Sequence, residues 1–193
     1  MQEISAAERE MFMVRRCKTE DFELRPLDKN RLSQFKKDMQ EAFQKGAEDG
    51  FGKMEEQILP ESHIDRSLNE DGAAAYEAFL DGQSVGGAIV KIDSVTNHNY
   101  LDFLYVKNGV HSKGVGLQIW KGIEDLYPQT KVWETCTPYF EKRNIHFYVN
   151  KCGFHIVEFF NPYHPDPHDL EEDLPDENEY FEGMFRFEKV MKP

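Results

Sequence analysis

The sequence is poor in cysteine and has no long apolar run. Its three cysteines, Cys17, Cys136 and Cys152, are widely spaced and odd in number, so they predict neither a disulfide framework nor a Cys-x-x-Cys metal site. No apolar stretch approaches the roughly 20 residues that span a bilayer. The first residues are polar and acidic rather than basic and then apolar, unlike a secretory signal. We therefore expect reduced thiols, no metal, no membrane partner and a cytoplasmic location.

Basic residues are also scarce. The chain has 23 lysines and arginines against 36 aspartates and glutamates, for a net charge of −13, which disfavours nucleic acid as a partner. Residues 107–151 are the exception, with seven basic and four acidic side chains, whereas residues 152–193 have three basic and eleven acidic ones. This distribution predicts either a binding segment for an anionic ligand within a cation-attracting surface, or a solvated acidic surface with a chance gap.

Two common glycine-rich phosphate motifs are absent. Residues 110–117 read Val-His-Ser-Lys-Gly-Val-Gly-Leu, without the Gly-Lys-Ser/Thr of a P-loop, and Ile119 stands where a dinucleotide fingerprint needs its third glycine. The aromatic and branched run at residues 100–106 predicts a strand just before this segment, with a turn at Asn108-Gly109. The glycines therefore follow a strand without matching either of those motifs.

An amphipathic helix is predicted immediately after this strand and turn. Val115, Ile119, Ile123 and Leu126 recur every three or four residues, so a helix can begin at Gly114 with one buried face. The first turn of a helix offers unpaired N–H groups and the positive end of the helix dipole, and glycine lets an anion approach the backbone closely. The segment therefore predicts a site for a phosphate or pyrophosphate.

Residues 111–116 resemble the signature of the GNAT superfamily of acyl-CoA-dependent N-acetyltransferases. In that signature Gln or Arg, two residues, Gly, one residue and then Gly or Ala follow the fourth strand, and His111 takes the Gln or Arg position here. The family also carries a later Tyr-x-x-x-x-Gly-Phe, and residues 148–154 read Tyr-Val-Asn-Lys-Cys-Gly-Phe. Residues 131–138 between them look like the family's fifth strand. The resemblance extends over residues 74–160.

The resemblance implies an α/β fold, with a twisted mixed β-sheet of about six to seven strands flanked by about four helices. It implies acetyl-CoA as the co-substrate, no metal, and direct transfer of the acetyl group to an amine. We expect a single acetyltransferase domain over residues 21–193, an N-terminal extension of uncertain order over residues 1–20, and an acidic proline-rich loop at residues 161–178. A homodimer is compatible with this organisation.

The other predicted elements come from local patterns. Residues 22–27 and 180–191 predict the first and last strands, and Asp81-Gly82 predicts a hairpin between residues 74–80 and 84–92. Gly86-Gly87 in that hairpin predicts a bulge or a close backbone approach.

Two early helices are expected. The first has an apolar stripe from Leu32 to Phe43 and should break at the glycines 46, 50 and 52, and the second spans residues 54–68 around Pro60. In the family the two early helices cover the acceptor site. Glu55, Glu56 and Asp65 therefore either line that site or form a solvated helix face.

The resemblance assigns acetyl-CoA binding to the fourth strand, residues 100–106, and to residues 110–117, the glycine segment. The strand backbone is expected to bind the acetyl carbonyl and pantetheine like an added strand, while the glycine segment binds the pyrophosphate. Asn144 is included although the family's asparagine falls at the position of Glu141. The residues expected to bind acetyl-CoA are Leu104, Tyr105, Val106, His111, Ser112, Lys113, Gly114, Val115, Gly116, Leu117 and Asn144.

Catalysis requires a neutral amine, yet at pH 7 only roughly one lysine-like amine in a thousand is neutral. By resemblance Tyr148 is the general acid that protonates the departing thiolate; otherwise it is a packed core tyrosine. The base is open between Asp102 and Glu134, acting directly or through water, and either carboxylate is otherwise structural. Tyr100 stands where some relatives carry a glutamate.

A covalent route through Cys136 or Cys152 is the competing mechanism. Neither cysteine is paired with a histidine base by any sequence signature, so core packing is the better interpretation of both.

The acidic loop has two interpretations. Residues 161–178 contain four prolines and seven acidic residues without a lysine or arginine, so they predict a solvated insertion or a rim that attracts a cationic acceptor. His164 and His168 with these acids could instead bind a metal, although proline-broken spacing makes this a weak alternative.

The expected function is N-acetylation of a cationic acceptor, a polyamine-like or aminoglycoside-like molecule or a basic peptide. The alternative is a non-catalytic acyl-CoA-binding or regulatory module.

Overall fold

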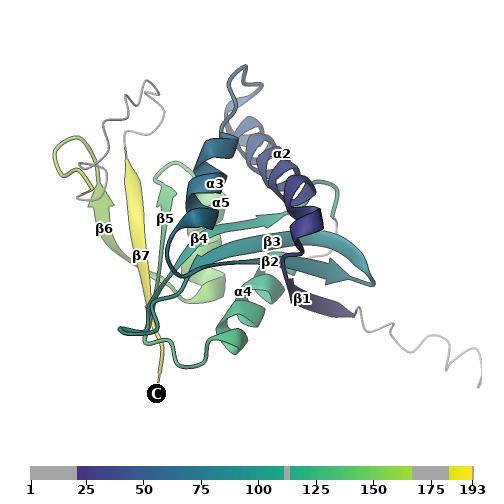
Figure 1. The fold of residues 1–193 in the computed structure, drawn as a ribbon. Helices are drawn as coiled ribbons and strands as arrows, with labels where there is room; N and C mark the ends of the chain where they lie inside the picture. Colours follow the sequence, from purple (N-terminus) through teal and green to yellow (C-terminus); the bar gives the residue numbers. More distant parts are fainter. Residues whose placement is uncertain (1–20, 111–113, 167–182, 193) are drawn as a thin grey trace, which may run out of the picture.

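The computed structural model describes residues 21–110, 114–166 and 183–192. Over these residues the chain forms one seven-stranded sheet in the order β1-β2-β3-β4-β5-β7-β6 (Figure 1). The strands are β1 (Phe22–Pro26), β2 (Ala73–Leu80), β3 (Gln83–Lys91), β4 (His98–Val106), β5 (Val132–Pro138), β6 (His155–Phe160) and β7 (Met184–Val190). Neighbouring strands are antiparallel except β4 and β5, which are parallel. The expected mixed sheet of an α/β fold is confirmed.

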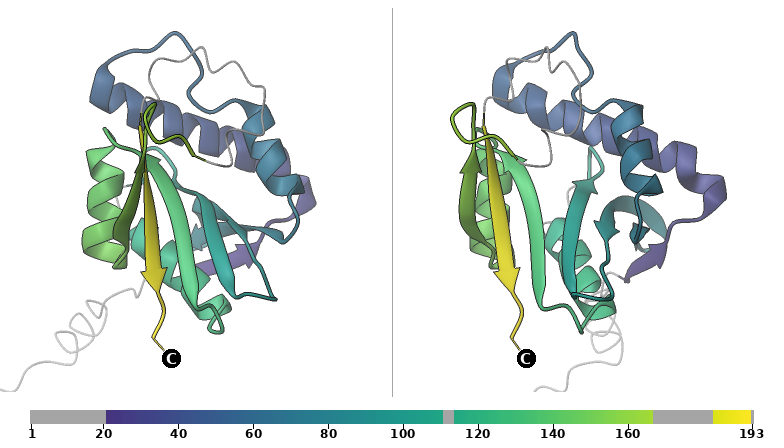
Figure 2. Two further views of the ribbon diagram at one scale, coloured as in Figure 1. Left: turned by 90° about the vertical axis from the view of Figure 1, so that its left-hand side faces the viewer. Right: turned by 60° about the vertical axis from the view of Figure 1, so that its left-hand side comes forward.

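Helices cover both faces of this sheet. Helices α2 (Leu32–Phe51) and α3 (Glu61–Asn69) lie on one face, and α4 (Val115–Leu126) and α5 (Lys142–His146) lie on the other (Figures 1 and 2). A 3-10 turn, η1 (Lys29–Arg31), precedes α2, and a π-helical turn, η2 (Phe147–Cys152), continues α5. Every helix in the described part of the chain is too short or too polar to span a bilayer.

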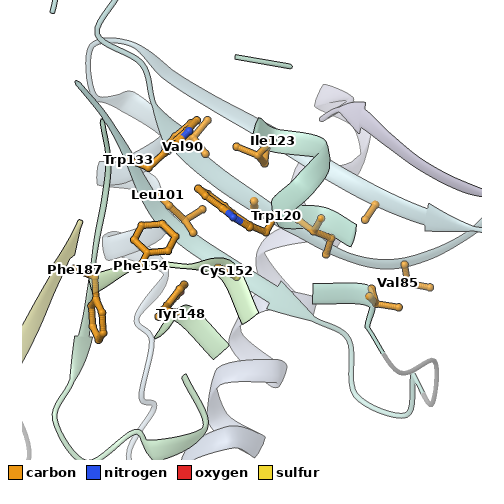
Figure 3. Close-up of a cluster of buried hydrophobic side chains, with 14 of the residues drawn as sticks. Val85, Val90, Leu101, Trp120, Ile123, Trp133, Tyr148, Cys152, Phe154 and Phe187 are labelled. Atoms are coloured by element: carbon orange, nitrogen blue, oxygen red, sulfur yellow. The ribbon is translucent and has the colours of Figure 1, made fainter. Parts of the chain in front are cut away.

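The larger hydrophobic core lies between the sheet and helix α4 with turn η2 (Figure 3). Trp120 of α4 packs edge-on against Trp133 of β5, with ring centroids 5.4 Å apart, and both side chains are buried. Phe154 and Phe187 extend this cluster to Tyr148. A smaller core on the other face packs α2 and α3 against the sheet. The predicted apolar stripe of α4 is buried in this core except for Leu126, which is 47% exposed.

Helix α2 is longer than the sequence predicted. It passes through Gly46 and Gly50 and ends only before Gly52, which has a φ of +88°. A glycine in a helix costs about 1 kcal/mol, and burial of Ala47 between the two glycines offsets part of that cost. The second expected helix is shorter, because α3 begins only at Glu61, after Pro60. A residue before proline avoids helical geometry, so residues 53–59 form a connection instead.

The structure contains both features predicted for Gly86-Gly87, a bulge and a close approach to the backbone. Strand β2 pairs Ala78 with Gly86 and Phe79 with Ser84, so an extra residue bulges from β3 just before the glycines. A Cβ atom on Gly87 would lie 2.5 Å from the Cε2 atom of Phe35. The glycine therefore lets helix α2 approach the sheet closely.

Several predictions fall outside the described residues. These include the N-terminal extension with Cys17, residues 167–178 of the acidic loop and the start of the last expected strand. The described part of that strand is β7.

Candidate active site

Strands β4 and β5 pair only at one end. Their register joins His98 to Val132 and continues to Tyr100, which is opposite Glu134, and beyond that point β5 no longer pairs with β4. Figure 2 shows the two strands side by side at one end and apart at the other. Strand β4 remains paired with β3 as far as Val106. One edge of β4 therefore lacks a strand partner, and such an edge can bind an extended chain with amide groups.

A β-bulge at Asp102 accompanies this divergence. Strand β3 pairs Val90 with Leu101 and Ile89 with Phe103, so Asp102 is the extra residue on β4. A bulge bends its strand and redirects a side chain. The Asp102 carboxylate accordingly reaches helix α3, where the hydroxyl of Ser67 donates a hydrogen bond to its Oδ2 atom.

A cavity of about 340 Å³ lies where the two strands diverge. Its walls come from α2, the connection before α3, α3 itself, β4, β5 and the segment of α5 and η2. Four residues expected at the site lie in these walls: Asp102, Leu104, Asn144 and Tyr148. The structure thus brings together one candidate base, the candidate acid and part of the expected CoA site.

Tyr148 belongs to both the core and the cavity. Its ring packs against Phe154 and Phe187 at centroid distances of 5.7 Å and 5.6 Å, and the side chain is 8% exposed (Figure 3). It lies in the π-helical turn η2, a type of turn that is frequent at functional sites. Burial raises the pKa of Tyr148 to about 12, although a hydrogen bond with Thr135 acts in the opposite direction. The phenol is therefore protonated at neutral pH.

Glu134 does not line the cavity. The Nη1 atom of Arg186 lies 2.9 Å from its Oε2 atom, and the Nε2 atom of His98 lies 3.3 Å from the same oxygen. Arg186 also bonds Glu158 and Glu188. His98, Glu134 and Glu188 present potential metal ligands within 4.8 Å of one another, but the guanidinium group of Arg186 already forms ion pairs with both carboxylates. We interpret Glu134 as part of an ion-pair cluster between β5, β6 and β7.

The described part of the glycine segment has the geometry of a helix start. Gly114 has a φ of +104° and precedes α4, and the Gln118 N–H donates a helical hydrogen bond to the Gly114 carbonyl. The N–H groups of residues 115–117 therefore have no acceptor within the helix. A Cβ on Gly116 would lie 3.5 Å from the Phe147 ring and 3.6 Å from Val106, so this helix start adjoins the end of β4 that is no longer paired with β5. His111, Ser112 and Lys113 lie outside the described residues.

Tyr105 and Asn144, two other residues expected to contact CoA, have different surroundings. The Tyr105 side chain is 3% exposed and packs against Phe35 on the α2 face, with ring centroids 5.4 Å apart. Only its backbone is therefore placed to contribute to a site on the edge of β4. Asn144 faces the cavity, with Nδ2 3.4 Å from the Oγ1 atom of Thr137.

The model of the acetyltransferase (GNAT) family matches residues 33–154, more than half of the chain. The chain belongs to the GNAT acetyltransferase family. This GNAT chain is 51% identical over 166 residues to the uncharacterized protein YrkN of Bacillus subtilis (strain 168), a match that spans 83% of this chain and 89% of YrkN.

Solved structures share the GNAT fold. The ribosomal-protein-S18-alanine N-acetyltransferase from Escherichia coli aligns with a TM-score of 0.64 and 11% identity, over 90% of this chain and 96% of that one. The PaiA N-acetyltransferase from Thermoplasma acidophilum, in complex with coenzyme A, aligns with a TM-score of 0.62 and 19% identity, over 89% of this chain and 99% of that one. At these identities the likeness concerns the fold.

The GNAT cavity contains residues that the sequence did not reveal. Phe43 and Ala47 of α2, with Met54 and Ile58 of the following connection, form an apolar part of its wall. The sequence left Glu55, Glu56 and Asp65 open between lining the site and a solvated helix face, and none of them lines the cavity; Asp65 forms an ion pair with Lys36. The apolar stripe of α2 could have indicated Phe43, but the connection has no periodic signal.

Tyr100 and Cys136 both line the cavity of this GNAT chain and are in hydrogen-bond contact. Tyr100 occupies the position where the resemblance implies a glutamate in some relatives, and burial raises its pKa well above the ordinary value, with Cys136 as a hydrogen-bond partner. Burial also raises the pKa of Cys136 to about 11. The thiol is therefore protonated at neutral pH, which disfavours a covalent route through Cys136.

Proposed function

We propose that this GNAT protein transfers the acetyl group of acetyl-CoA directly to a primary amine. The observation that supports the proposal is the convergence of three features: the unpaired edge of β4, the start of α4, and a cavity that contains both Asp102 and Tyr148. The first two features suit an extended ligand with amide and phosphate groups. The cavity adds groups that can move protons beside that ligand.

The chain's residues fit acetyl-CoA in several respects. The backbone from Leu104 to Val106 would pair with amide groups along the ligand, and the N–H groups that begin α4 would bind phosphate oxygens. The absence of a side chain on Gly116 leaves the helix start open beside Val106. Acetyl-CoA would supply the activated acetyl thioester. We include His111, Ser112, Lys113 and Asn144 in the proposed site on the basis of the family motif.

Asp102 is the proposed base. An amine must lose a proton before it attacks, and the carboxylate of Asp102 lies in the cavity wall and is oriented by Ser67. It would accept that proton directly or through one water molecule. Glu134 is engaged by Arg186 and lies outside the cavity lining, so we propose a structural role for it.

Tyr148 is the proposed donor to the departing sulfur. A pKa of about 12 keeps its proton in place, and an ordinary thiol has a pKa of about 8.5. Complete proton transfer from Tyr148 to a thiolate is therefore uphill. We expect the phenol to contribute mainly by donating a hydrogen bond that stabilises the departing sulfur.

The acceptor is proposed to be cationic before it is deprotonated. The net charge of −13 favours the approach of ammonium groups. Two structural neighbours are consistent with amine acceptors: the E. coli enzyme is a ribosomal-protein-S18-alanine N-acetyltransferase, and Naa50 from Arabidopsis thaliana was solved with the bisubstrate analogue CoA-Ac-MVNAL. A cytoplasmic location and a homodimer stay predictions, to be tested by cell fractionation and light scattering.

The proposal is tested by following thiol release from acetyl-CoA with a chromogenic disulfide across alkylamines, polyamines, aminoglycosides, amino acids and lysine-containing peptides. Calorimetry measures CoA affinity in parallel. We expect amine-dependent release, with the acetylated amine identified by mass spectrometry. Tight binding without release for every amine would support the alternative of a non-catalytic acyl-CoA-binding module, and the absence of binding would refute the assigned site.

A further inference from the structure

The acceptor side of the cavity has an apolar wall that is built into the fold. Phe43 of α2 packs edge-on against Phe103 of β4, with ring centroids 5.8 Å apart, and both rings line the cavity next to Asp102. Met54 and Ile58 of the connection before α3 continue this wall. The cavity thus places a carboxylate beside an apolar surface.

Hydrogen bonds hold the connection against α2. The Nε2 atom of Gln44 donates to the Glu56 carbonyl at 3.2 Å, and the Ile58 N–H donates to Gln44 Oε1 at 3.1 Å. Gln40 adds a bond of 3.0 Å to the Leu59 carbonyl. Two side chains of one helix therefore fix the backbone that carries Ile58, so the apolar wall is a fixed part of the structure.

The carboxylates around the cavity are not equally available to a cationic ligand. Three described lining residues are acidic: Glu70, Asp102 and Glu141. Glu70 forms an ion pair with Lys91. Glu141 is half-buried, and burial raises its pKa although Arg143 acts in the opposite direction. Among these described residues, Asp102 has a hydroxyl partner rather than a cation, and its carboxylate lies in the same cavity wall as Phe43 and Phe103.

We propose that the acceptor is a primary monoamine attached to an apolar body, rather than a polyamine or an aminoglycoside. This inference rests on the proposed acetyl transfer and specifies its substrate class. A single ammonium group would lie beside Asp102 while methylene or aromatic groups cover the wall formed by Phe43, Met54 and Ile58. A second ammonium group would be placed against that wall, where loss of hydration without a partner is costly.

The test compares hexylamine with hexamethylenediamine, which has the same chain and one more amine. Thiol release from acetyl-CoA gives kcat/KM for both, and we expect hexylamine to be faster by about tenfold or more because the distal ammonium group loses hydration. Propylamine should be slower than hexylamine, by up to about fourfold for each missing methylene that the wall buries. Equal or faster turnover of the diamine would overturn the proposal.

A variant of the wall should change this preference. Met54 is half-buried in the wall, whereas Gln57 is exposed and outside the lining. Met54→Glu supplies a carboxylate for the distal ammonium group, so the diamine-to-monoamine ratio of kcat/KM should rise about tenfold. Gln57→Glu adds the same charge outside the cavity and should leave the ratio within about twofold. An equal rise in both variants would show a general charge effect and contradict the assigned wall.

The measured rates distinguish a wrong substrate class from the absence of acetyl transfer. If no amine accelerates thiol release, acetyl transfer itself is refuted, and with it this inference. If amines are acetylated with the diamine preferred, only the substrate class is wrong. A dipeptide amide with an N-terminal leucine presents one ammonium group beside an apolar side chain. If the enzyme acetylates this dipeptide amide faster than hexylamine, the monoamine class is supported and the acceptor is a peptide N-terminus. If it acetylates hexylamine faster, the acceptor is a free amine.

Discussion

The hydroxyl of Ser67 on helix α3 donates a hydrogen bond to the carboxylate of Asp102 on strand β4. The bond joins one of the early helices to the bulged strand, across 35 residues of sequence. It fixes the carboxylate in the cavity wall while leaving it without a cationic partner among the described lining residues. The proposed base therefore depends on the packing of α3 against the sheet.

Replacement of this carboxylate should separate the two candidate bases. Asp102→Asn should lower kcat by about a hundredfold or more with CoA affinity within about twofold, because its amide cannot accept the proton. Glu134→Gln should keep kcat within about threefold, since Glu134 is bonded to Arg186 outside the cavity lining. Steady-state kinetics and calorimetry check both variants. The reverse order of effects would assign the base to Glu134.

Ser67→Ala should have a smaller effect than loss of the carboxylate. The carboxylate keeps its charge but loses the hydroxyl that orients it, so we expect kcat to fall about three- to tenfold. Ser84→Ala is the matched control, because Ser84 also donates a hydrogen bond to a carboxylate, that of Glu77, which does not line the cavity. An equal fall in both variants would show that stability, not orientation of Asp102, causes the effect.

Tyr148→Phe should lower kcat about tenfold to a hundredfold and leave CoA affinity within about twofold. Because the pKa of Tyr148 is raised to about 12, its phenol stays protonated through the ordinary tyrosine range near pH 10. The rate of the unmodified protein should therefore not fall through ionisation of Tyr148 as the pH rises towards that range. Tyr127→Phe, which alters a tyrosine bonded to Tyr76 away from the cavity, serves as the control. A decline near pH 10 that disappears in Tyr148→Phe would contradict the raised pKa.

Gly114→Asp should weaken CoA binding by about tenfold or more. The φ of +104° disfavours a side chain, and a negative charge at the helix start opposes a phosphate ligand. Gly82→Asp is the control, because Gly82 has a φ of +77° and equally open surroundings but lies in the β2–β3 hairpin rather than at a helix start. Calorimetry with CoA measures both. Unchanged affinity in Gly114→Asp would refute the phosphate site.

The Arg31–Glu77 pair makes a prediction about stability. Arg31 donates two hydrogen bonds of 2.6 Å to Glu77, which is 2% exposed. Arg31→Met should destabilise the protein by about 3 kcal/mol at pH 7, the lower end for such pairs because Arg31 is partly exposed. Arg25→Met, at an exposed pair with Glu23, should change stability by less than about 1 kcal/mol. Urea unfolding measures both.

The pH dependence of this destabilisation provides a second test. Burial alone would raise the pKa of Glu77, but hydrogen bonds from Arg31 and Ser84 outweigh burial and lower it. The pair therefore stabilises the native protein above the unfolded pKa of about 4.3 and loses that contribution as pH falls through the lower folded value. The difference between native protein and Arg31→Met should thus shrink on acidification. A difference that does not change with pH would contradict the ion-pair explanation.

Much of the fold could be predicted from local patterns. The periodicity of residues 115–126 predicted α4, and Asp81-Gly82 predicted the β2–β3 hairpin. Both signals arise between residues close in sequence, where one buried face or one tight turn determines the conformation. The extent of α2 was missed because the packing of residues such as Ala47 is set by tertiary contacts and outweighs the local preference of glycine.

The candidate site could be predicted only in part. Motif spacing indicated Tyr148 and the glycines at the start of α4, which lie near one another because Gly116 adjoins Phe147. The sequence could not choose between Asp102 and Glu134, which stand on neighbouring strands. The bulge directs the first carboxylate to Ser67, and Arg186 of β7 engages the second.

The sequence by itself determined that a strand, a glycine-containing helix start and a tyrosine-bearing segment follow one another at the spacing of a GNAT protein, because these features depend on local periodicity and turn chemistry. The tertiary structure decided which carboxylate enters the cavity and that an apolar wall from α2 and the following connection faces it. Those features depend on strand register and on contacts between segments distant in sequence, and such contacts form only when the sheet and helices pack together.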